Sequence, residues 1–257
     1  MKKWLGMLLA SVVAVSFVLT GCTNKNTDNS VIQIGTNAEF PPFEKLEGDG
    51  KITGFDADLI QAIAKEENLK INFKHYGWDQ MLDGVSRGKL DAGMAAITIT
   101  PDRKKKYDFS IPYFDAKQLI LVPTSSHVSS LKQLNGKRIG VQTATTGEQV
   151  VQEMFGKTYS GLKGYDDIPS AVHDLELGRL DAVVVDNAVI MEYIKKLGQG
   201  KYKIVEDPSI KTEQYGIAVH KGNQALLQKL NDGLKKVKAN GTYDKIYQKY
   251  FGTEPQQ

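Results

Sequence analysis

The stretches GKLDA at Gly88–Ala92 and GRLDA at Gly178–Ala182 repeat one short motif ninety positions apart. In both, a glycine ends a helical pattern, as a left-handed helix cap requires, and a basic residue follows at the negative end of the helix. A leucine then points to the core, and an aspartate begins a strand. Because such junctions are common between helices and strands, the motif alone does not show whether the chain contains a structural repeat.

The residues around the first copy alternate between strand and helix patterns. Helices are recognised by apolar residues on one face, and strands by alternating or continuous apolar residues. Five elements are expected, in this order: strand Val31–Thr36, helix Gly54–Glu67, strand Leu69–Tyr76, helix Trp78–Arg87 and strand Ala92–Thr98. This alternation predicts a parallel sheet covered by helices.

The same order of elements restarts ahead of the second copy. The expected elements there are strand Lys137–Thr143, helices Glu148–Phe155 and Pro169–Leu177, and strand Asp181–Val185. Two restarts in the same order favour an α/β protein with two lobes. Three further elements follow, namely a strand at Gln214–Val219 and helices at Gln224–Asn240 and Thr242–Phe251. We expect these two helices to return to the first lobe.

The expected return makes the chain cross twice between the lobes. We predict lobe 1 from residues 31–112 with 218–257, lobe 2 from residues 118–212, and hinge crossings at 113–117 and 213–217. Hinged lobes leave a cleft between them, and small ligands bind in such clefts.

The first thirty residues form a separate segment. Lys2 and Lys3 precede an apolar run at Trp4–Leu19 that is short for a membrane helix and typical of a signal peptide. The run ends in LTGC, and Cys22 is the single cysteine of the chain. We predict a lipoprotein signal peptide at 1–21, lipidation of Cys22, and a polar tether at 22–30. The alternative is a thiol near an ordinary cleavage site.

The composition excludes several classes of function. Of the 257 residues, 33 are basic and 30 are acidic, so a net charge of +3 gives no reason to expect a nucleic-acid partner. The four histidines lack metal-ligand spacing, and neither a nucleophile elbow nor a phosphate-binding glycine loop is present. The acidic pair Asp56 and Asp58 opens a helix, where capping and the helix dipole explain it better than catalysis. We therefore expect no enzyme, no metal and no cofactor.

The stretch AAITITPDRKKKYDFS at Ala95–Ser110 carries a candidate anion site. A strand delivers Thr98 to the carboxyl edge of a sheet, and Pro101 starts a short helix from which Arg103 projects. A hydroxyl, free backbone N–H groups and a guanidinium suit a carboxylate, because arginine grips it with two parallel hydrogen bonds. Alternatively, Arg103 is part of a basic surface with Lys104–Lys106.

Several stretches along Val31–Pro255 together resemble the polar amino-acid family of bacterial solute-binding proteins. They are GTNAEFPPFE, GFDADL, AAITITPDRKKKYDFS, IGVQTATTGE, LDAVVVDNA and QYGIAVHKGN with NGTYDKIYQKYFGTEP. The resemblance implies a type II periplasmic-binding-protein-like fold, an extracytoplasmic location and an amino-acid ligand. It also implies the permease and ATPase of an ABC importer as partners, and a monomer. With Cys22 lipidated, the protein would be anchored to the cell membrane.

The resemblance also implies the site. Arg103 would hold the ligand α-carboxylate, with help from Thr98 and the backbone at Thr145 and Thr146. Asp186 would hold the α-ammonium together with the backbone edge around Ala95 and Ala96, although it could also cap the following helix. Phe40 and Phe55 would sandwich the ligand side chain unless both are core residues. The two lobes then offer opposite charges to one zwitterion.

The nature of the ligand side chain stays between two alternatives. Glutamine binders commonly carry a lysine at the position of Gln142 and a histidine at that of Val185, and neither is present here. Glu39 would attract a cationic side chain if it turned inward. Asn37 stands where many relatives place an acidic residue, which suits glutamine or a weaker grip on a cation. The balance favours arginine, lysine or histidine over glutamine.

Two other functions remain as alternatives. An enzyme on the same fold, similar to cyclohexadienyl dehydratase, would need a general acid or base in the cleft beyond Arg103 and Asp186. A sensory module would need a transmembrane helix or an output domain.

Overall fold

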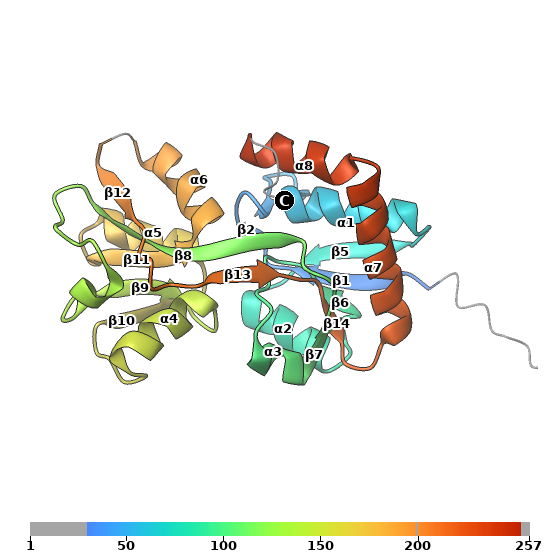
Figure 1. Cartoon of the computed structure of the whole chain (residues 1–257), viewed down its shortest axis with the longest axis horizontal. Helices are drawn as coiled ribbons and strands as arrows, with labels where there is room; N and C mark the ends of the chain where they lie inside the picture. The colour runs from blue at the N-terminus through green and yellow to red at the C-terminus, as the bar shows by residue number, and fades with distance from the viewer. Residues whose placement is uncertain (1–29, 199, 253–257) are drawn as a thin grey trace, which may run out of the picture.

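The computed structural model describes residues 30–198 and 200–252 of the chain. The expected signal peptide at 1–21, the lipidation site Cys22 and nearly all of the tether at 22–30 lie outside these residues. Within the described part, no helix combines the length and the apolar character that crossing a membrane demands. Figure 1 shows two lobes side by side, joined by extended strands.

The elements confirm the predicted α/β fold class with two lobes. The strands are β1 Ile32–Thr36, β2 Glu39–Phe40, β3 Glu44–Leu46, β4 Ile52–Thr53, β5 Ile71–His75, β6 Ala92–Gly93, β7 Tyr107–Phe109, β8 Phe114–Pro123, β9 Ile139–Gln142, β10 Leu162–Tyr165, β11 Ala182–Asp186, β12 Tyr202–Val205, β13 Thr212–Tyr215 and β14 Ala218–His220. The helices are α1 Phe55–Glu66, α2 Trp78–Ser86, α3 Pro101–Lys106, α4 Thr146–Phe155, α5 Ile168–Glu176, α6 Asn187–Leu197, α7 Gln224–Ala239 and α8 Thr242–Phe251, with a 3₁₀ turn at Leu131–Leu134.

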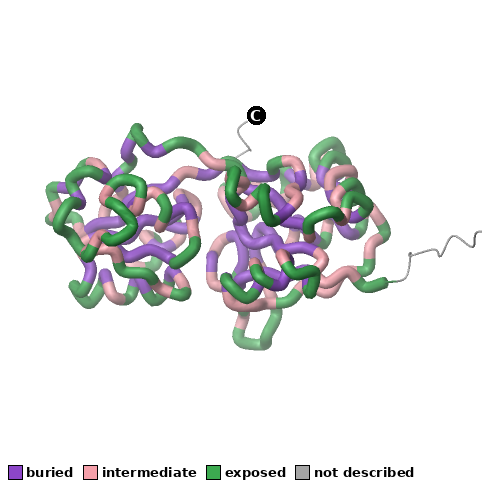
Figure 2. Tube along the Cα trace, turned by 90° about the horizontal axis from the view of Figure 1, so that it is seen from below, coloured by how far each residue is buried: buried purple, intermediate pink, exposed green. Residues whose placement is uncertain are grey.

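Each lobe is built on its own sheet. In lobe 1 the strand order is β5-β1-β6-β14-β7, in which β1 pairs in parallel with β5 and β6 while β14 is antiparallel to its neighbours. In lobe 2 the order is β10-β9-β11-β8-β12. A small antiparallel sheet of β2, β3 and β4 adds to lobe 1. The buried segments run through the centre of both lobes (Figure 2), and one cluster of buried apolar side chains continues from Ile34 in lobe 1 to Val183 in lobe 2.

The repeated motif does the same work in both lobes. Gly88 and Gly178 have φ angles of 71° and 68°, as the predicted left-handed caps require. The leucine that follows packs over a glycine of the neighbouring parallel strand, β1 or β9: a Cβ on Gly35 would lie 2.7 Å from Leu90 Cδ1, and one on Gly140 would overlap Leu180. The motif therefore fixes how a helix packs on its sheet.

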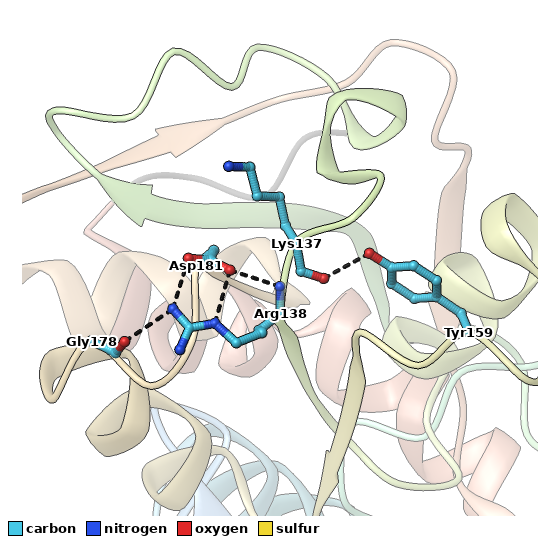
Figure 3. A network of polar contacts seen from close by, with 5 residues as sticks. All are labelled: Lys137, Arg138, Tyr159, Gly178 and Asp181. Atoms are coloured by element: carbon cyan, nitrogen blue, oxygen red, sulfur yellow. Dashed lines mark hydrogen bonds and ion pairs between the residues drawn. The ribbon is translucent and has the colours of Figure 1, made fainter.

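The aspartates of the motif also have matching partners. In lobe 1 Asp91 Oδ2 accepts a hydrogen bond from the backbone N–H of Gln33 at 2.7 Å. In lobe 2 Asp181 Oδ2 accepts one from the backbone N–H of Arg138 at 2.8 Å, and the Arg138 guanidinium adds an ion pair to the same carboxylate (Figure 3). Each aspartate thus hydrogen-bonds the beginning of β6 or β11 to the beginning of the neighbouring parallel strand, β1 or β9.

The two connections between the lobes lie side by side. β8 and β13 pair antiparallel, from Phe114 opposite Tyr215 to Lys117 opposite Thr212 (Figure 1). After β13 the chain re-enters lobe 1 through β14, and both α7 and α8 then pack against α1. Both helices therefore lie against a helix of lobe 1, where their return was expected.

Two expected strands are shorter than predicted. The strand expected over Ala92–Thr98 is continuous only at Ala92–Gly93, because Ala96 has a φ angle of 48° and the chain turns out of the sheet there, and Thr98 forms an isolated bridge with Tyr215. The strand expected over Gln214–Val219 is divided into β13 and β14, with Gly216 donating its N–H to Ile97 between them. Both interruptions lie at the boundary of the lobes, where backbone groups turn toward the cleft.

Candidate functional site

A cleft between the lobes has an empty volume of ≈ 310 Å³, part of which is open to solvent. Lobe 1 contributes Asn37, Phe40, Glu44, Trp78, Ala95, Ala96, Thr98 and Arg103, and lobe 2 contributes Gln142, Thr145, Thr146 and Asp186. Nine of the ten residues expected in a ligand site therefore line one cleft. They come from the carboxyl edges of the two sheets, where ligands of open α/β sheets bind.

The expectation for Phe55 is wrong. Phe55 is not among the residues that line the cleft; its side chain is fully buried, and its ring packs among other aromatic rings of lobe 1. Those nearest are Phe43, Phe114, Phe251 and Tyr243, with ring centroids 5.2–6.1 Å away. The first residue of α1 therefore points into the core, and the aromatic residue that lines the cleft besides Phe40 is a different one.

That residue is Trp78, which was expected from the sequence only as the start of a helix. Trp78 is the first residue of α2 and follows the carboxyl end of β5 after a short turn. Residues just beyond strand ends line the cleft in such sheets, and this position was the available signal. The indole N–H of Trp78 points across the cleft to the carbonyl of Ala144 in lobe 2, at 3.4 Å.

Arg103 projects from α3 into the cleft. Thr100 caps this helix by accepting the N–H of Arg103 at 3.1 Å, and Pro101 occupies the first turn, as expected. The guanidinium donates to the carbonyl of Thr98 at 2.9 Å and, across the cleft, to that of Ala144 at 3.1 Å. These bonds use two of its five N–H donors. Its centre lies 5.4 Å above the Trp78 ring, which adds a cation–π contact.

Asp186 ends β11 and faces the cleft from lobe 2. It occupies the N-cap position of α6, but its side chain makes no capping bond. Its Oδ1 instead accepts the hydroxyl of Tyr215 at 2.5 Å. Burial raises the pKa of Asp186 to about 6, with a smaller contribution from the negative charge of Glu213. At neutral pH the cleft therefore contains a buried carboxylate.

Glu213, which the sequence reasoning did not single out, joins the two lobes. Its Oε2 accepts the hydroxyl of Thr98 from lobe 1 at 3.1 Å and the hydroxyl of Thr146 from lobe 2 at 2.8 Å. Gln118 on β8 donates to the same oxygen at 3.3 Å. Because these hydroxyls donate to Glu213, the donors that remain at this end of the cleft are backbone N–H groups and Arg103.

Amides link the lobes at the other end of the cleft. Gln142 Nε2 donates to Asn37 Oδ1 at 3.2 Å, and Asn37 Nδ2 donates to Glu39 Oε2 at 2.9 Å. The Glu39 carboxylate therefore turns toward a residue of the cleft lining. With the contacts of Trp78 and Arg103, these bonds hold the lobes in a closed arrangement.

Glu44 is a buried carboxyl in the cleft lining that the sequence reasoning also missed. It is fully buried, and neither carboxyl oxygen meets a hydrogen-bond donor among the described residues. Its carboxyl neighbour is Asp56. A capping role was expected for Asp56, but its Oδ2 instead accepts the N–H of Ala96 and the hydroxyl of Tyr113, both at 2.8 Å. Burial, and next to it the charge of Asp56, raises the pKa of Glu44 well above its ordinary value.

The described residues hold no cluster of three or more metal-ligating side chains. The charged residues of the cleft lining are Arg103 and Glu44 from lobe 1 and Asp186 from lobe 2. Such an arrangement suits a small molecule that carries complementary charges.

The chain is similar to known solute-binding proteins over most of its length. Residues 32–253 match the family model described as bacterial extracellular solute-binding proteins, family 3. A probable histidine-binding protein of Neisseria gonorrhoeae is 41% identical, over 99% of this chain and 97% of its own length. The curated relatives compared are named as binding proteins and not as enzymes.

Two solved structures are similar over nearly their whole length. The arginine-, lysine-, histidine-binding protein ArtJ of Geobacillus stearothermophilus has a TM-score of 0.85 and 42% identity, covering 88% of this chain and 97% of that one. An ancestral arginine-binding protein bound to glutamine has a TM-score of 0.80 and 44% identity, covering 87% and 98%.

Proposed function

The chain belongs to family 3 of the bacterial extracellular solute-binding proteins, and we propose that it captures a basic L-amino acid in its cleft and delivers it to the permease of an ABC importer. The family makes the protein an extracytoplasmic amino-acid-binding protein rather than an enzyme. The choice of a basic ligand rests on Glu44, a buried carboxyl in the cleft lining that lacks a donor.

The proposed binding mode follows the charges of the cleft. Arg103 binds the α-carboxylate through the N–H donors that Thr98 and Ala144 leave free, together with backbone N–H groups at Thr145 and Thr146. Asp186 binds the α-ammonium. Charge-assisted hydrogen bonds of this kind contribute about 1.5–3 kcal/mol each. Because the two groups belong to different lobes, a bound amino acid stabilises closure, with β8 and β13 as the hinges.

The ligand side chain then extends toward Glu44. Phe40 and Trp78 provide apolar and aromatic surface for its stem. A guanidinium, ammonium or imidazolium supplies the donors that Glu44 lacks. With Glu44 ionised, the charges of Arg103, Asp186 and Glu44 sum to −1, which a ligand of net charge +1 neutralises.

Glutamine is the second candidate, because a similar ancestral arginine-binding protein has been solved with glutamine bound. A glutamine side chain can donate to Glu44 through its amide, but it brings no charge. We therefore expect glutamine to bind more weakly than arginine.

The ligand assignment is tested by titrating the purified protein with arginine, lysine, histidine, citrulline and glutamine, using isothermal calorimetry. Basic amino acids are expected to bind at least about tenfold more tightly than glutamine, since each charge-assisted bond is worth about 1.4 kcal/mol or more. Arg103→Ala and Asp186→Ala should abolish binding, whereas Lys104→Ala, on the same helix but outside the cleft lining, should not. Tighter binding of glutamine than of arginine would reject the basic ligand.

We also propose that the protein is a lipoprotein held to the membrane through Cys22 and the tether at 22–30. The support is the LTGC sequence after an apolar run. Detergent-phase partitioning of the protein from cells tests the anchor: Cys22→Ser should move it from the detergent phase to the aqueous phase, and an unchanged partition would reject lipidation.

A further inference from the structure

Glu44 and Asp56 are brought together by a close approach of two backbone segments. The N–H of Phe55 donates to the carbonyl of Pro42, and that of Asp56 donates to the carbonyl of Phe43, both at 2.9 Å. These bonds lay the start of α1 along the residues that lead into β3. Both carboxyl groups are fully buried there, and the Glu44 side chain lines the cleft.

The hydrogen bonds of the pair are unequal. Asp56 Oδ2 accepts two bonds, from the N–H of Ala96 and the hydroxyl of Tyr113. Asp56 Oδ1 and both oxygens of Glu44 have no donor among the described residues. A carboxylate that accepts a backbone N–H and a phenol is stabilised in its charged form, so Asp56 is the better place for a negative charge.

The other titratable groups near the pair do not neutralise it. The nearby tyrosines are Tyr113, just before β8, and Tyr243 on α8. Burial raises the pKa of each hydroxyl, so both stay neutral. The other charged residues of the cleft lining are Asp186 of lobe 2 and Arg103 of lobe 1, whose guanidinium donates to the carbonyls of Thr98 and Ala144. Two adjacent buried carboxyls cannot both ionise without a cation beside them. In the empty cleft one proton therefore stays on the pair, on Glu44.

We propose that Glu44 releases this proton to solvent when the cationic side chain of a ligand binds, so that the cleft exchanges one proton for one ligand cation. The inference rests on the proposed function. The O–H bond of Glu44 breaks, the proton goes to the buffer, and the carboxylate accepts hydrogen bonds from the ligand. A neutral side chain leaves Glu44 protonated and releases no proton there. Discrimination between side chains then depends on charge, not only on shape.

The direction of the pKa values agrees with this exchange. Burial raises the pKa of Glu44 well above its ordinary value and that of Asp56 to about 6. A proton thus resides on the pair at neutral pH, and a cation beside Glu44 would lower its pKa again.

The test counts protons released on binding, by calorimetry at pH 7.0 in buffers of different ionisation enthalpy. Arginine is compared with citrulline, which has nearly the same shape and no side-chain charge. Both ligands make the same contacts with Arg103 and Asp186, so any release at those residues cancels in the comparison. Arginine should release about one proton more than citrulline. By linkage, the Kd for arginine should fall about tenfold for each unit that the pH rises, in the range where that proton is released.

A variant separates Glu44 from other sources of protons. Glu44→Gln has the shape of the protonated carboxyl, and its release on binding arginine should fall to the citrulline level, with about tenfold or greater loss of affinity. Glu47→Gln is the matched control on the same hairpin, where the side chain pairs with Lys45 outside the cleft lining, and should behave as wild type.

The outcomes are distinguishable. Equal proton counts for arginine and citrulline in the wild-type protein would overturn the exchange while leaving arginine binding in place. Failure of arginine to bind at all would instead contradict the proposed function. An excess release that persists in Glu44→Gln would also overturn the assignment of the proton to Glu44.

Discussion

Asp186 is a buried carboxylate whose stabilising partner in the described structure is a phenol, not a cation. Its pKa lies at about 6 instead of the ordinary 3.8, mainly because of burial. This acid is raised in the folded state, so its contribution to stability is fully present below pH 3.8 and is lost as the pH rises through about 6. Above that pH the ionised Asp186 carboxylate lowers the stability of the ligand-free protein. The same negative charge is the one proposed to bind an ammonium group.

We predict that Asp186→Asn makes the empty protein more stable at pH 7.5 while abolishing amino-acid binding. Asparagine keeps an acceptor for Tyr215 but removes the buried charge. The shift of the pKa from 3.8 to about 6 corresponds to a free-energy cost of that charge on the order of 3 kcal/mol. Urea unfolding should show a gain of about 1–3 kcal/mol at pH 7.5 that disappears near pH 4. A variant that is less stable than wild type at pH 7.5 would show that the carboxylate is needed for the fold.

The sequence predicted some residues of the cleft correctly and gave no signal for others. The cleft contains Arg103 and Asp186, whose charges and positions at strand ends were visible in the sequence. It does not contain Phe55, and the sequence gives no sign that the ring of this first residue of α1 packs into the core instead of the cleft. Glu44 gave no signal at all: a single carboxyl beside a core phenylalanine becomes meaningful only when its lack of donors is seen.

At the scale of elements, the approach of α1 to the hairpin before it depends on Gly54. This residue has a φ angle of 131°, and a Cβ at this position would overlap the carbonyl group of Phe43 and lie 2.8 Å from Glu44 Cα. The absence of a side chain therefore allows the segment that places Asp56 beside Glu44.

Gly54→Ala should accordingly destabilise the protein by about 3 kcal/mol or more, because backbone atoms must move. Gly50→Ala is the matched control: Gly50 also has a positive φ angle, 84°, but an added Cβ would meet nothing within 4 Å. That variant should lose only about 1 kcal/mol, the cost of the left-handed conformation. Equal losses in the two variants, measured by urea unfolding, would contradict the role of the close approach.

Helices were more predictable than strands. The helix α2 begins at Trp78 as expected and ends at Ser86, one residue before the expected end, because its periodicity is local. The strand expected to reach Thr98 ends at Gly93 instead, since the positive φ of Ala96 and the bond of its N–H to Asp56 depend on a residue forty positions away. Long β8 had no expected counterpart, because its residues serve two lobes in turn.

At the scale of the whole molecule, Glu213 connects the lobes without a ligand. Thr98 and Thr146 reach the same carboxylate oxygen from opposite lobes, at 3.1 and 2.8 Å. These bonds can form together only when the lobes are closed. They therefore contribute to the closed state by the same amount whichever amino acid is bound.

We predict that Glu213→Ala weakens binding of arginine, lysine and histidine by a common factor of about ten, because two hydrogen bonds of the closed state are lost. The change should be found mainly in faster dissociation, measured by stopped-flow tryptophan fluorescence. Glu206→Ala is the control, since its exposed carboxylate pairs with Lys117 on β8 outside the cleft. Loss for one ligand only would mean that Glu213 acts on the side chain instead of on closure.

The place of β14 between β6 and β7 also sets an order of assembly. Lobe 2 is one uninterrupted insertion, so all of its strands have left the ribosome or the export channel before residue 218 appears. The sheet of the other lobe lacks its inner antiparallel strand until then, and its outer helices α7 and α8 arrive last. A nascent chain stopped after Tyr215 would consequently contain a finished insertion inside an unfinished host.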